Sequence, residues 1–127
     1  MRAVGLLFAA ALLASGAAGA TDGDPAHGEA VYQRCLACHA LEHNRVGPRH
    51  CGLFGRRAGS LPGYAYSAAM KKYGVTWNDE TLDRFLQNPM QAVPGTKMGY
   101  AGVKDSQERA DLIAYLKQAT GDPKICE

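Results

Sequence analysis

Apolar residues recur with helical spacing in three stretches of the chain, and each stretch follows a residue that commonly caps helices. The first helix is predicted from Asp24, an N-cap followed by a proline, to about Cys38. The second is predicted to begin after Thr76, its N-cap, and to end at the Asn-Pro pair of residues 88–89. Its apolar face consists of Leu82, Phe85 and Leu86.

The third predicted helix has the clearest pattern, opening after Asp105 and stopping at Gly121. Its apolar stripe is formed by Leu112, Ile113, Leu116 and Ala119. A shorter helix is expected over residues 67–73. Within the first helix, Gly28 is either simply tolerated or marks a close crossing with another helix.

Glycine and proline punctuate the two long segments between these helices, residues 40–66 and 91–103, which show no helical period. A structured loop as long as residues 40–66 usually wraps a ligand or carries function. Because no segment alternates apolar and polar residues, the chain is predicted to be all-α, with a few helices joined by long loops.

The first twenty residues have the composition of an export signal. Arg2 gives a positive start, residues 3–14 are almost uninterruptedly apolar, and Ala18-Gly19-Ala20 fits a cleavage site. The alternative is a membrane anchor, but the apolar run is shorter than the roughly 20 residues that a bilayer span needs. We therefore predict a cleaved signal peptide at residues 1–20, export to the periplasm, and no membrane insertion after cleavage.

Composition and charge narrow the classes of function. The 127 residues suit one domain, predicted at residues 21–120 with an extension at 121–127. A formal net charge of only +2 argues against a general nucleic-acid binder. A domain of this size has a marginal core, so a large apolar cofactor at its centre would add burial that the side chains alone do not provide.

The most specific chemistry belongs to Cys35, Cys38 and His39, in the order Cys-x-x-Cys-His. This pattern predicts covalent haem attachment, with a thioether from each cysteine and His39 as an iron ligand. A thioredoxin-like dithiol would need a βαβ context, which is missing here. A zinc site would need a second ligand pair, whereas Cys51 and Cys126 stand alone.

The other face of such an iron needs its own ligand, and Met98 is the candidate. It lies in residues 94–102, a segment with enough glycine to bring the backbone close to a flat ligand. A thioether favours ferrous iron and raises the reduction potential, which suits an electron carrier. Met70 and Met90 are expected to fill the core. The rival iron ligands, expected at the surface, are His27, His43 and His50.

Seven further motifs follow one another within residues 24–120. They are Gly47-Pro48, Gly52-Leu53-Phe54-Gly55-Arg56, Pro62-Gly63-Tyr64-Ala65-Tyr66-Ser67, Thr76-Trp77, Asn88-Pro89, Pro94-Gly95-Thr96-Lys97-Met98 and Asp111-Leu112-Ile113-Ala114-Tyr115-Leu116. With these motifs the chain resembles the class I cytochrome c family, close to mitochondrial cytochrome c and the bacterial cytochromes c2. The resemblance implies that family's fold, a few helices and long loops wrapped around one covalently bound haem c.

The resemblance also implies places for residues around the haem. Pro48 would pack beside His39, with a neighbouring carbonyl accepting the imidazole N–H. Thr96 would support the Met98 loop, and Tyr100 would cover the haem edge. The propionate side would consist of Arg56, Tyr66 and Trp77.

Two regions depart from the family pattern. Phe85 stands where the family usually has a tyrosine near the methionine sulfur, and His50 and Cys51 are both unusual at their positions. An oxidising compartment favours a disulfide between Cys51 and Cys126, which would tether residues 121–127. Two free thiols or an intermolecular bond are the alternatives.

The preferred interpretation is a monomeric periplasmic electron carrier that is not an enzyme. A dehydrogenase or a cytochrome bc1-type complex would supply electrons, and a terminal oxidase or photosynthetic reaction centre would accept them. Acidic docking surfaces on these partners would match basic residues around the haem edge, drawn from Arg34, Arg45, Arg57, Lys71, Lys72, Lys97 and Lys104. The rival functions are a haem peroxidase or gas sensor with a displaceable Met98, and a thiol oxidoreductase without covalent haem.

Overall fold

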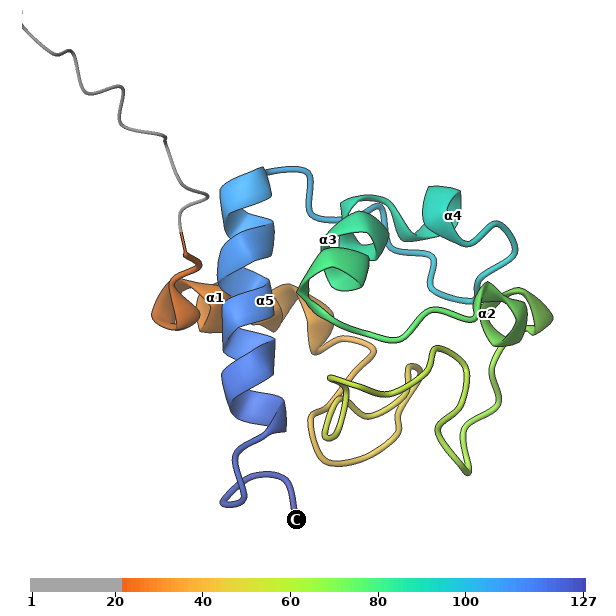
Figure 1. The fold of residues 1–127 in the computed structure, drawn as a ribbon, viewed down its shortest axis with the longest axis horizontal. Helices are drawn as coiled ribbons and strands as arrows, with labels where there is room; N and C mark the ends of the chain where they lie inside the picture. The colour runs from red at the N-terminus through yellow and green to blue at the C-terminus, as the bar shows by residue number, and fades with distance from the viewer. Residues whose placement is uncertain (1–21) are drawn as a thin grey trace, which may run out of the picture.

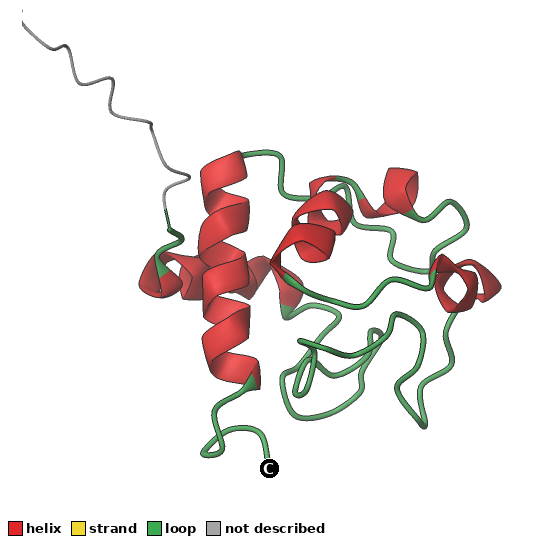
Figure 2. Cartoon of the chain, in the orientation of Figure 1, coloured by secondary structure: helices red, strands yellow, loops and turns green. Residues whose placement is uncertain are grey.

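The computed structural model describes residues 22–127 as helices joined by long loops (Figures 1 and 2). The predicted signal peptide, residues 1–20, lies outside the described residues. The elements are α1 (Pro25–Tyr32), the 3-10 turn η1 (Gln33–Cys35), α2 (Ala68–Tyr73), α3 (Asp79–Gln87), α4 (Pro89–Ala92) and α5 (Ser106–Thr120). Across residues 22–127 the only β pairing is a single bridge between Arg57 and Thr76, so the all-α prediction is confirmed.

A short polar side chain caps the N-terminus of every α-helix in the described part of the chain. In chain order the caps are Asp24, Ser67, Asn78, Asn88 and Asp105. The prediction of Thr76 as the cap before α3 is wrong, because Asn78 and Thr81 form a reciprocal capping box. Thr81 N donates to Asn78 Oδ1 and Asn78 N donates to Thr81 Oγ1, each at 2.9 Å.

Two helix boundaries also differ from the predictions. α1 ends at Tyr32 rather than near Cys38, because the chain tightens into η1 and a turn in which Cys38 N donates to Cys35 O at 3.2 Å. Residues 91–92, predicted to be irregular, belong to α4. Pro89 takes the first position of that helix, where its missing N–H is not needed.

α5 crosses α1 at Gly28 (Figure 1). A Cβ atom on Gly28 would lie 1.9 Å from Asp111 O and 2.8 Å from Tyr115 Cβ, so only glycine fits between the two helices. At the same crossing, the buried carboxylate of Asp111 accepts hydrogen bonds from Asp24 N at 2.7 Å and His27 Nδ1 at 2.6 Å. Gly28 therefore marks a close helix crossing, and His27 forms a hydrogen bond with Asp111 at that crossing.

One apolar core extends from this crossing to α3 and the segments around it. Its main members are Val31, Tyr32, Leu53, Trp77, Leu82, Phe85, Leu86, Val93, Val103, Leu112, Ile113 and Leu116. The predicted apolar faces of α3 and α5 are thus confirmed. Buried Arg109 joins these helices, because its Nε donates to Asp83 Oδ1 at 2.8 Å and its Nη1 to Val103 O at 3.1 Å. Within residues 22–127 no helix combines the length and apolar character required to cross a membrane.

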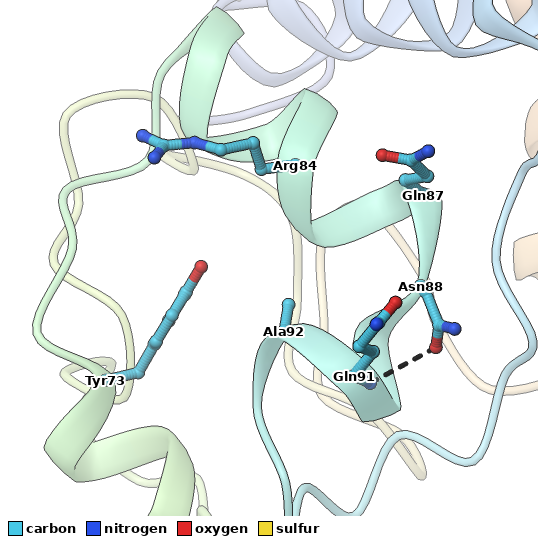
Figure 3. A pocket seen from close by; sticks show the side chains of 6 residues that line it. All are labelled: Tyr73, Arg84, Gln87, Asn88, Gln91 and Ala92. Atoms are coloured by element: carbon cyan, nitrogen blue, oxygen red, sulfur yellow. Dashed lines mark hydrogen bonds between the residues drawn. The ribbon is translucent and has the colours of Figure 1, made fainter.

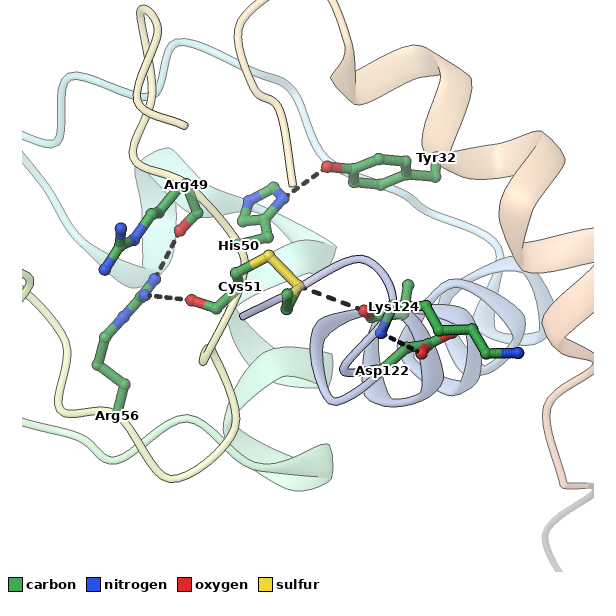
Figure 4. The surroundings of a disulfide bond; sticks show 9 residues. Tyr32, Arg49, His50, Cys51, Arg56, Asp122 and Lys124 are labelled. Carbon is green, nitrogen blue, oxygen red and sulfur yellow. Dashed lines mark hydrogen bonds between the residues drawn. A yellow bond between two sulfur atoms is a disulfide. The ribbon is translucent and has the colours of Figure 1, made fainter. Parts of the chain in front are cut away.

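The C-terminal extension is held against the long loop. Cys51 and Cys126 are joined by a disulfide with their Cα atoms 5.4 Å apart (Figure 4). Beside it, Gly52 N donates to Thr120 O at 3.3 Å, so the loop also contacts the end of α5 through its backbone. The end of the chain is therefore fastened next to the residues that follow Pro48.

Candidate cofactor site

Ten residues predicted from the sequence to surround a cofactor line one cavity of about 460 Å³. They are Cys35, Cys38, His39, Pro48, Arg56, Tyr66, Trp77, Thr96, Met98 and Tyr100. Several apolar core side chains of α3 and α5 complete the wall. The fold thus gathers η1, the long loop and the glycine-rich segment 94–102 around a single space.

His39 lies at the wall of this cavity, where one hydrogen bond holds an edge of its ring. Its ring is buried, and its Nδ1 donates to Pro48 O at 2.9 Å, which leaves Nε2 available to bind a metal. The backbone of Gly47 approaches so closely that a Cβ there would lie 2.2 Å from His39 Cε1. Burial lowers the pKa of His39, with the Pro48 carbonyl opposing part of that effect. This favours the neutral imidazole that ligates metals.

Cys35 and Cys38 are both free of disulfides. Burial raises the pKa of the Cys35 thiol to about 11, whereas the cysteines of dithiol oxidoreductases have lowered pKa values. This argues against the thioredoxin-like alternative. Among residues 22–127 no group of three or more His, Cys, Asp or Glu side chains is placed to hold a metal ion, which argues against the zinc alternative.

The loop that carries Met98 is held by hydrogen bonds on the N-terminal side of that residue. Met98 N donates to Thr96 Oγ1 at 3.2 Å, and Thr96 N donates to Val93 O at 3.0 Å. Lys97 Nζ donates to Ala65 O at 2.8 Å and so links this segment to the long loop. The Met98 side chain is half-buried at the cavity wall.

Arg56 brings a positive charge to another part of the wall. Its guanidinium donates to Arg49 O at 2.9 Å and to Cys51 O at 3.2 Å (Figure 4). Burial lowers its pKa, and in the described part of the chain no carboxylate forms an ion pair with it. A half-buried cation whose protein partners are carbonyls suits an anionic group of a bound cofactor.

Four aromatic residues of the cavity wall form two pairs. Tyr66 packs against Tyr64 with ring centroids 4.7 Å apart, and the Tyr64 hydroxyl donates to Val46 O at 2.6 Å. Trp77 packs against Phe85 with centroids 5.1 Å apart, and both are buried. The wall near Phe85 is therefore apolar.

The sequence prediction for His50 is wrong. It was expected at the surface, but its half-buried ring lines the cavity and stacks on His39 with centroids 4.3 Å apart. Its Nδ1 shares a 2.9 Å hydrogen bond with the hydroxyl of buried Tyr32 (Figure 4). Burial lowers the pKa of His50 well below its usual range. The available signal was its position, two residues after the proline beside His39.

A smaller hollow of about 260 Å³ lies beside α3 and α4 (Figure 3). It is lined by Tyr73, Arg84, Gln87, Asn88, Gln91 and Ala92. The Arg84 side chain is 64% exposed and pairs with Glu80 at 3.4 Å. This hollow is an open surface feature, and none of the predicted cofactor residues lines it.

The basic residues predicted to match acidic partner surfaces have different surroundings in the fold. Arg34 lines the cavity but forms two hydrogen bonds with the carboxylate of Glu108, at 2.7 and 2.8 Å, so its charge is balanced locally. Lys97 lines the cavity, while Lys71 and Lys72 are exposed on α2.

The cavity chemistry fits a haem. Two thiols, an imidazole nitrogen and a thioether face one largely apolar space, and a guanidinium without a carboxylate partner lies at its wall. These are the groups needed to attach a haem, ligate its iron and offset a propionate.

Comparison with known proteins points the same way. Residues 25–120 match the family model for cytochrome c. The chain is 46% identical over 120 residues to cytochrome c2 of Blastochloris viridis, covering 92% of this chain and 94% of that protein. It is 50% identical over 102 residues to cytochrome c of Chlamydomonas reinhardtii, covering 77% and 91% of the two chains. The solved structure of cytochrome cH from Methylobacterium extorquens matches with a TM-score of 0.73 and 46% identity, covering 76% of this chain and 99% of that one.

Proposed function

Because the chain belongs to the cytochrome c family, whose members carry electrons and are not enzymes, we propose that it uses one haem c with His39 and Met98 as axial ligands. Cys35 and Cys38 would hold the haem covalently. The observation that carries the proposal is the meeting of these four side chains at one cavity, although Met98 is far from the other three in the sequence.

The surroundings of the two proposed ligands suit rapid electron transfer. The bound haem supplies the one-electron redox chemistry. The Pro48 carbonyl accepts a hydrogen bond from Nδ1–H of His39, and Thr96 Oγ1 accepts one from the backbone N–H of Met98. Both ligands therefore keep their places when the charge of the site changes. Because the two ligands move little when the haem gains or loses an electron, the site favours electron transfer over substrate binding.

The remaining wall residues are proposed to receive the outer parts of the haem. Arg56 would offset a propionate, since it has a half-buried charge and only carbonyl partners in the protein. Tyr66 and Trp77 would lie on the same side as Arg56. Tyr100 would cover the haem edge, which its half-buried place at the cavity wall supports.

We propose that the protein works as a monomer in the periplasm after removal of residues 1–20. The export pattern in the sequence and the similarity to bacterial proteins named cytochrome c2 support this location. Redox proteins would donate and accept the electron: a dehydrogenase or cytochrome bc1-type complex, and an oxidase or reaction centre. Exposed Lys71 and Lys72, with Lys97 at the cavity wall, would steer the acidic docking surfaces of these partners.

Spectroscopy of the exported protein and of Met98→Ala tests the ligand assignment. The haem should stay with the chain after denaturation, and the native ferrous protein should not bind carbon monoxide rapidly. Met98→Ala should lose the methionine–iron absorption band, bind carbon monoxide and show a lower midpoint potential. Met90, which was expected in the core, is instead 48% exposed and lies outside the cavity. Met90→Ala is therefore the matched control and should behave as wild type. Rapid carbon monoxide binding by the wild type would instead support a gas-binding function.

We also propose that Cys51 and Cys126 form a disulfide in the exported protein. Their Cα separation of 5.4 Å lies within the usual range for a disulfide. Thiol titration of the folded, non-reduced protein should find neither cysteine reactive. Two reactive thiols would rule out this bond.

A further inference from the structure

His50 connects the core of the protein to the ring of His39. The two rings stack with an interplanar angle of 22° and centroids 4.3 Å apart. The Nδ1 of His50 shares a hydrogen bond with the Tyr32 hydroxyl. Tyr32 is only 2% exposed and packs on Tyr115 of α5, with ring centroids 5.2 Å apart. The contact with His39 is thus continuous with the crossing of α1 and α5.

The position of His50 is fixed at its backbone as well as at its ring. His50 N donates to Ala40 O at 3.2 Å and to Leu41 O at 3.1 Å, the two residues that follow His39. The next residue, Cys51, is joined to Cys126 (Figure 4). The backbone that carries the His50 ring is therefore held beside His39, and the hydrogen bond with Tyr32 holds the ring itself.

The contacts of His50 and Pro48 on His39 are different in kind. The Pro48 carbonyl holds one edge of the His39 ring through Nδ1, and a single hydrogen bond still permits the ring to tilt about it. The stacked ring of His50 covers a face and opposes that tilt. Its polar imidazole also makes the surroundings of His39 less apolar than a hydrocarbon side chain would.

We propose that His50 is a positioning residue that fixes the orientation of the His39 ring and lowers the reduction potential relative to an apolar residue at the same place. This inference rests on the proposed function, in which His39 binds the haem iron. Polar surroundings favour the ferric state, which carries one more positive charge than the ferrous state. Removing the polar ring should therefore raise the potential.

Three variants of the haem-loaded protein separate the stacking from the hydrogen bond. His50→Leu removes both, His50→Phe keeps a ring for stacking, and Tyr32→Phe removes only the hydroxyl. The readouts are the midpoint potential and the paramagnetic proton shifts of the haem methyl groups in the ferric protein, which report the orientation of the ligand ring. His43→Leu, at an exposed histidine outside the cavity, is the matched control.

We expect His50→Leu to change the order of the methyl shifts and to raise the potential. His50→Phe should raise the potential but keep the wild-type order, and Tyr32→Phe should raise it less than either. His43→Leu should change neither readout. A residue with a merely structural role would lower the melting temperature without these changes.

Wild-type shifts and potential in a folded His50→Leu holoprotein would overturn the inference. If that variant does not fold, unchanged potentials in both His50→Phe and Tyr32→Phe overturn it equally. Neither result would contradict the proposed function, because the covalent haem and the methionine–iron band would still be present. Their absence from the wild type would overturn the proposed function itself.

Discussion

Gly47 and His39 approach each other more closely than a side chain at position 47 permits. The hypothetical Cβ lies 2.2 Å from His39 Cε1 and 2.6 Å from both ring nitrogens. Any substitution must therefore move the ring or the backbone. The absence of a side chain at this one residue is a condition for the hydrogen bond between His39 and Pro48.

Gly47→Ala should accordingly displace the His39 ring and lower the free energy of unfolding by roughly 1–3 kcal/mol, the usual effect of forcing an extra methyl group into a packed site. Urea unfolding and the ferric absorption spectrum measure the two effects. Gly121→Ala is the control, because Gly121 lies outside the cavity and the nearest atom to a Cβ there is 3.4 Å away. Equal behaviour of the two variants would contradict the steric explanation.

His27 and Asp111 make stability depend on pH. The hydrogen bond to Asp111 raises the pKa of His27, with nearby Glu108 and Asp24 adding to it. The Asp24 backbone N–H is the main cause that lowers the pKa of Asp111, followed by His27 and Gln107. The His27 contribution is complete below the unfolded pKa and disappears as pH rises through the higher folded value. The Asp111 contribution is complete above its unfolded pKa and disappears as pH falls through the lower folded value.

The contribution of His27 to stability should therefore fall as the pH rises from about 6.5, the ordinary value of histidine, through the higher folded pKa. His27→Gln should flatten this fall in urea unfolding experiments, while His43→Gln, at an exposed histidine, should leave it unchanged. The same slope in wild type and His27→Gln would show that the pair does not contribute.

At the crossing of α1 and α5, the two helices are too close for a side chain at position 28. Gly28→Ala places a methyl group 1.9 Å from Asp111 O, so the helices must separate. Alanine gains about 1 kcal/mol of helix propensity over glycine, but overpacking at a backbone contact outweighs that gain. We expect a net loss of about 2 kcal/mol in urea unfolding. Gly121→Ala, where the nearest atom is 3.4 Å away, should change stability much less.

The elements that could be predicted from the sequence are those with a strong local pattern. The apolar stripe of α5 and the caps at Asp24 and Asp105 were predicted correctly, because adjacent residues determine both features. The cap at Asn78 was missed, since Thr76 and Asn78 are both good capping residues and only the reciprocal bond with Thr81 decides between them.

The cofactor site also contains residues that a local motif predicts and residues that only the folded chain brings together. Cys35, Cys38 and His39 stand in a local motif, and Met98 has a recognisable context. The contact of His50 with His39 depends instead on how the loop folds back after Pro48, which no local spacing reveals. Pairing of Arg34 with Glu108 is likewise a tertiary contact between distant residues.

At the scale of the whole molecule, the bond between Cys51 and Cys126 closes most of the chain into a ring. Its sequence separation of 75 residues gives a stabilisation of about 4 kcal/mol in the chain-entropy model, because the unfolded chain is restricted. Replacing both cysteines with serine should lower the free energy of unfolding by up to this amount in urea. The methionine–iron band should persist in the folded variant. Unchanged stability would show that the bond does not constrain the unfolded chain.

The pairing of Cys51 with Cys126 also has a consequence for biosynthesis. Thioether formation consumes Cys35 and Cys38 as reduced thiols, whereas Cys51 and Cys126 must be oxidised. One polypeptide would thus require opposite treatments of its four cysteine sulfur atoms in the same compartment. Since Cys126 follows Cys51 by 75 residues, Cys51 can pair with it only after that length of chain has emerged. During that interval Cys35 and Cys38 are the nearest competing partners of Cys51 along the sequence. Prompt haem attachment would remove these competitors and so protect the correct pairing.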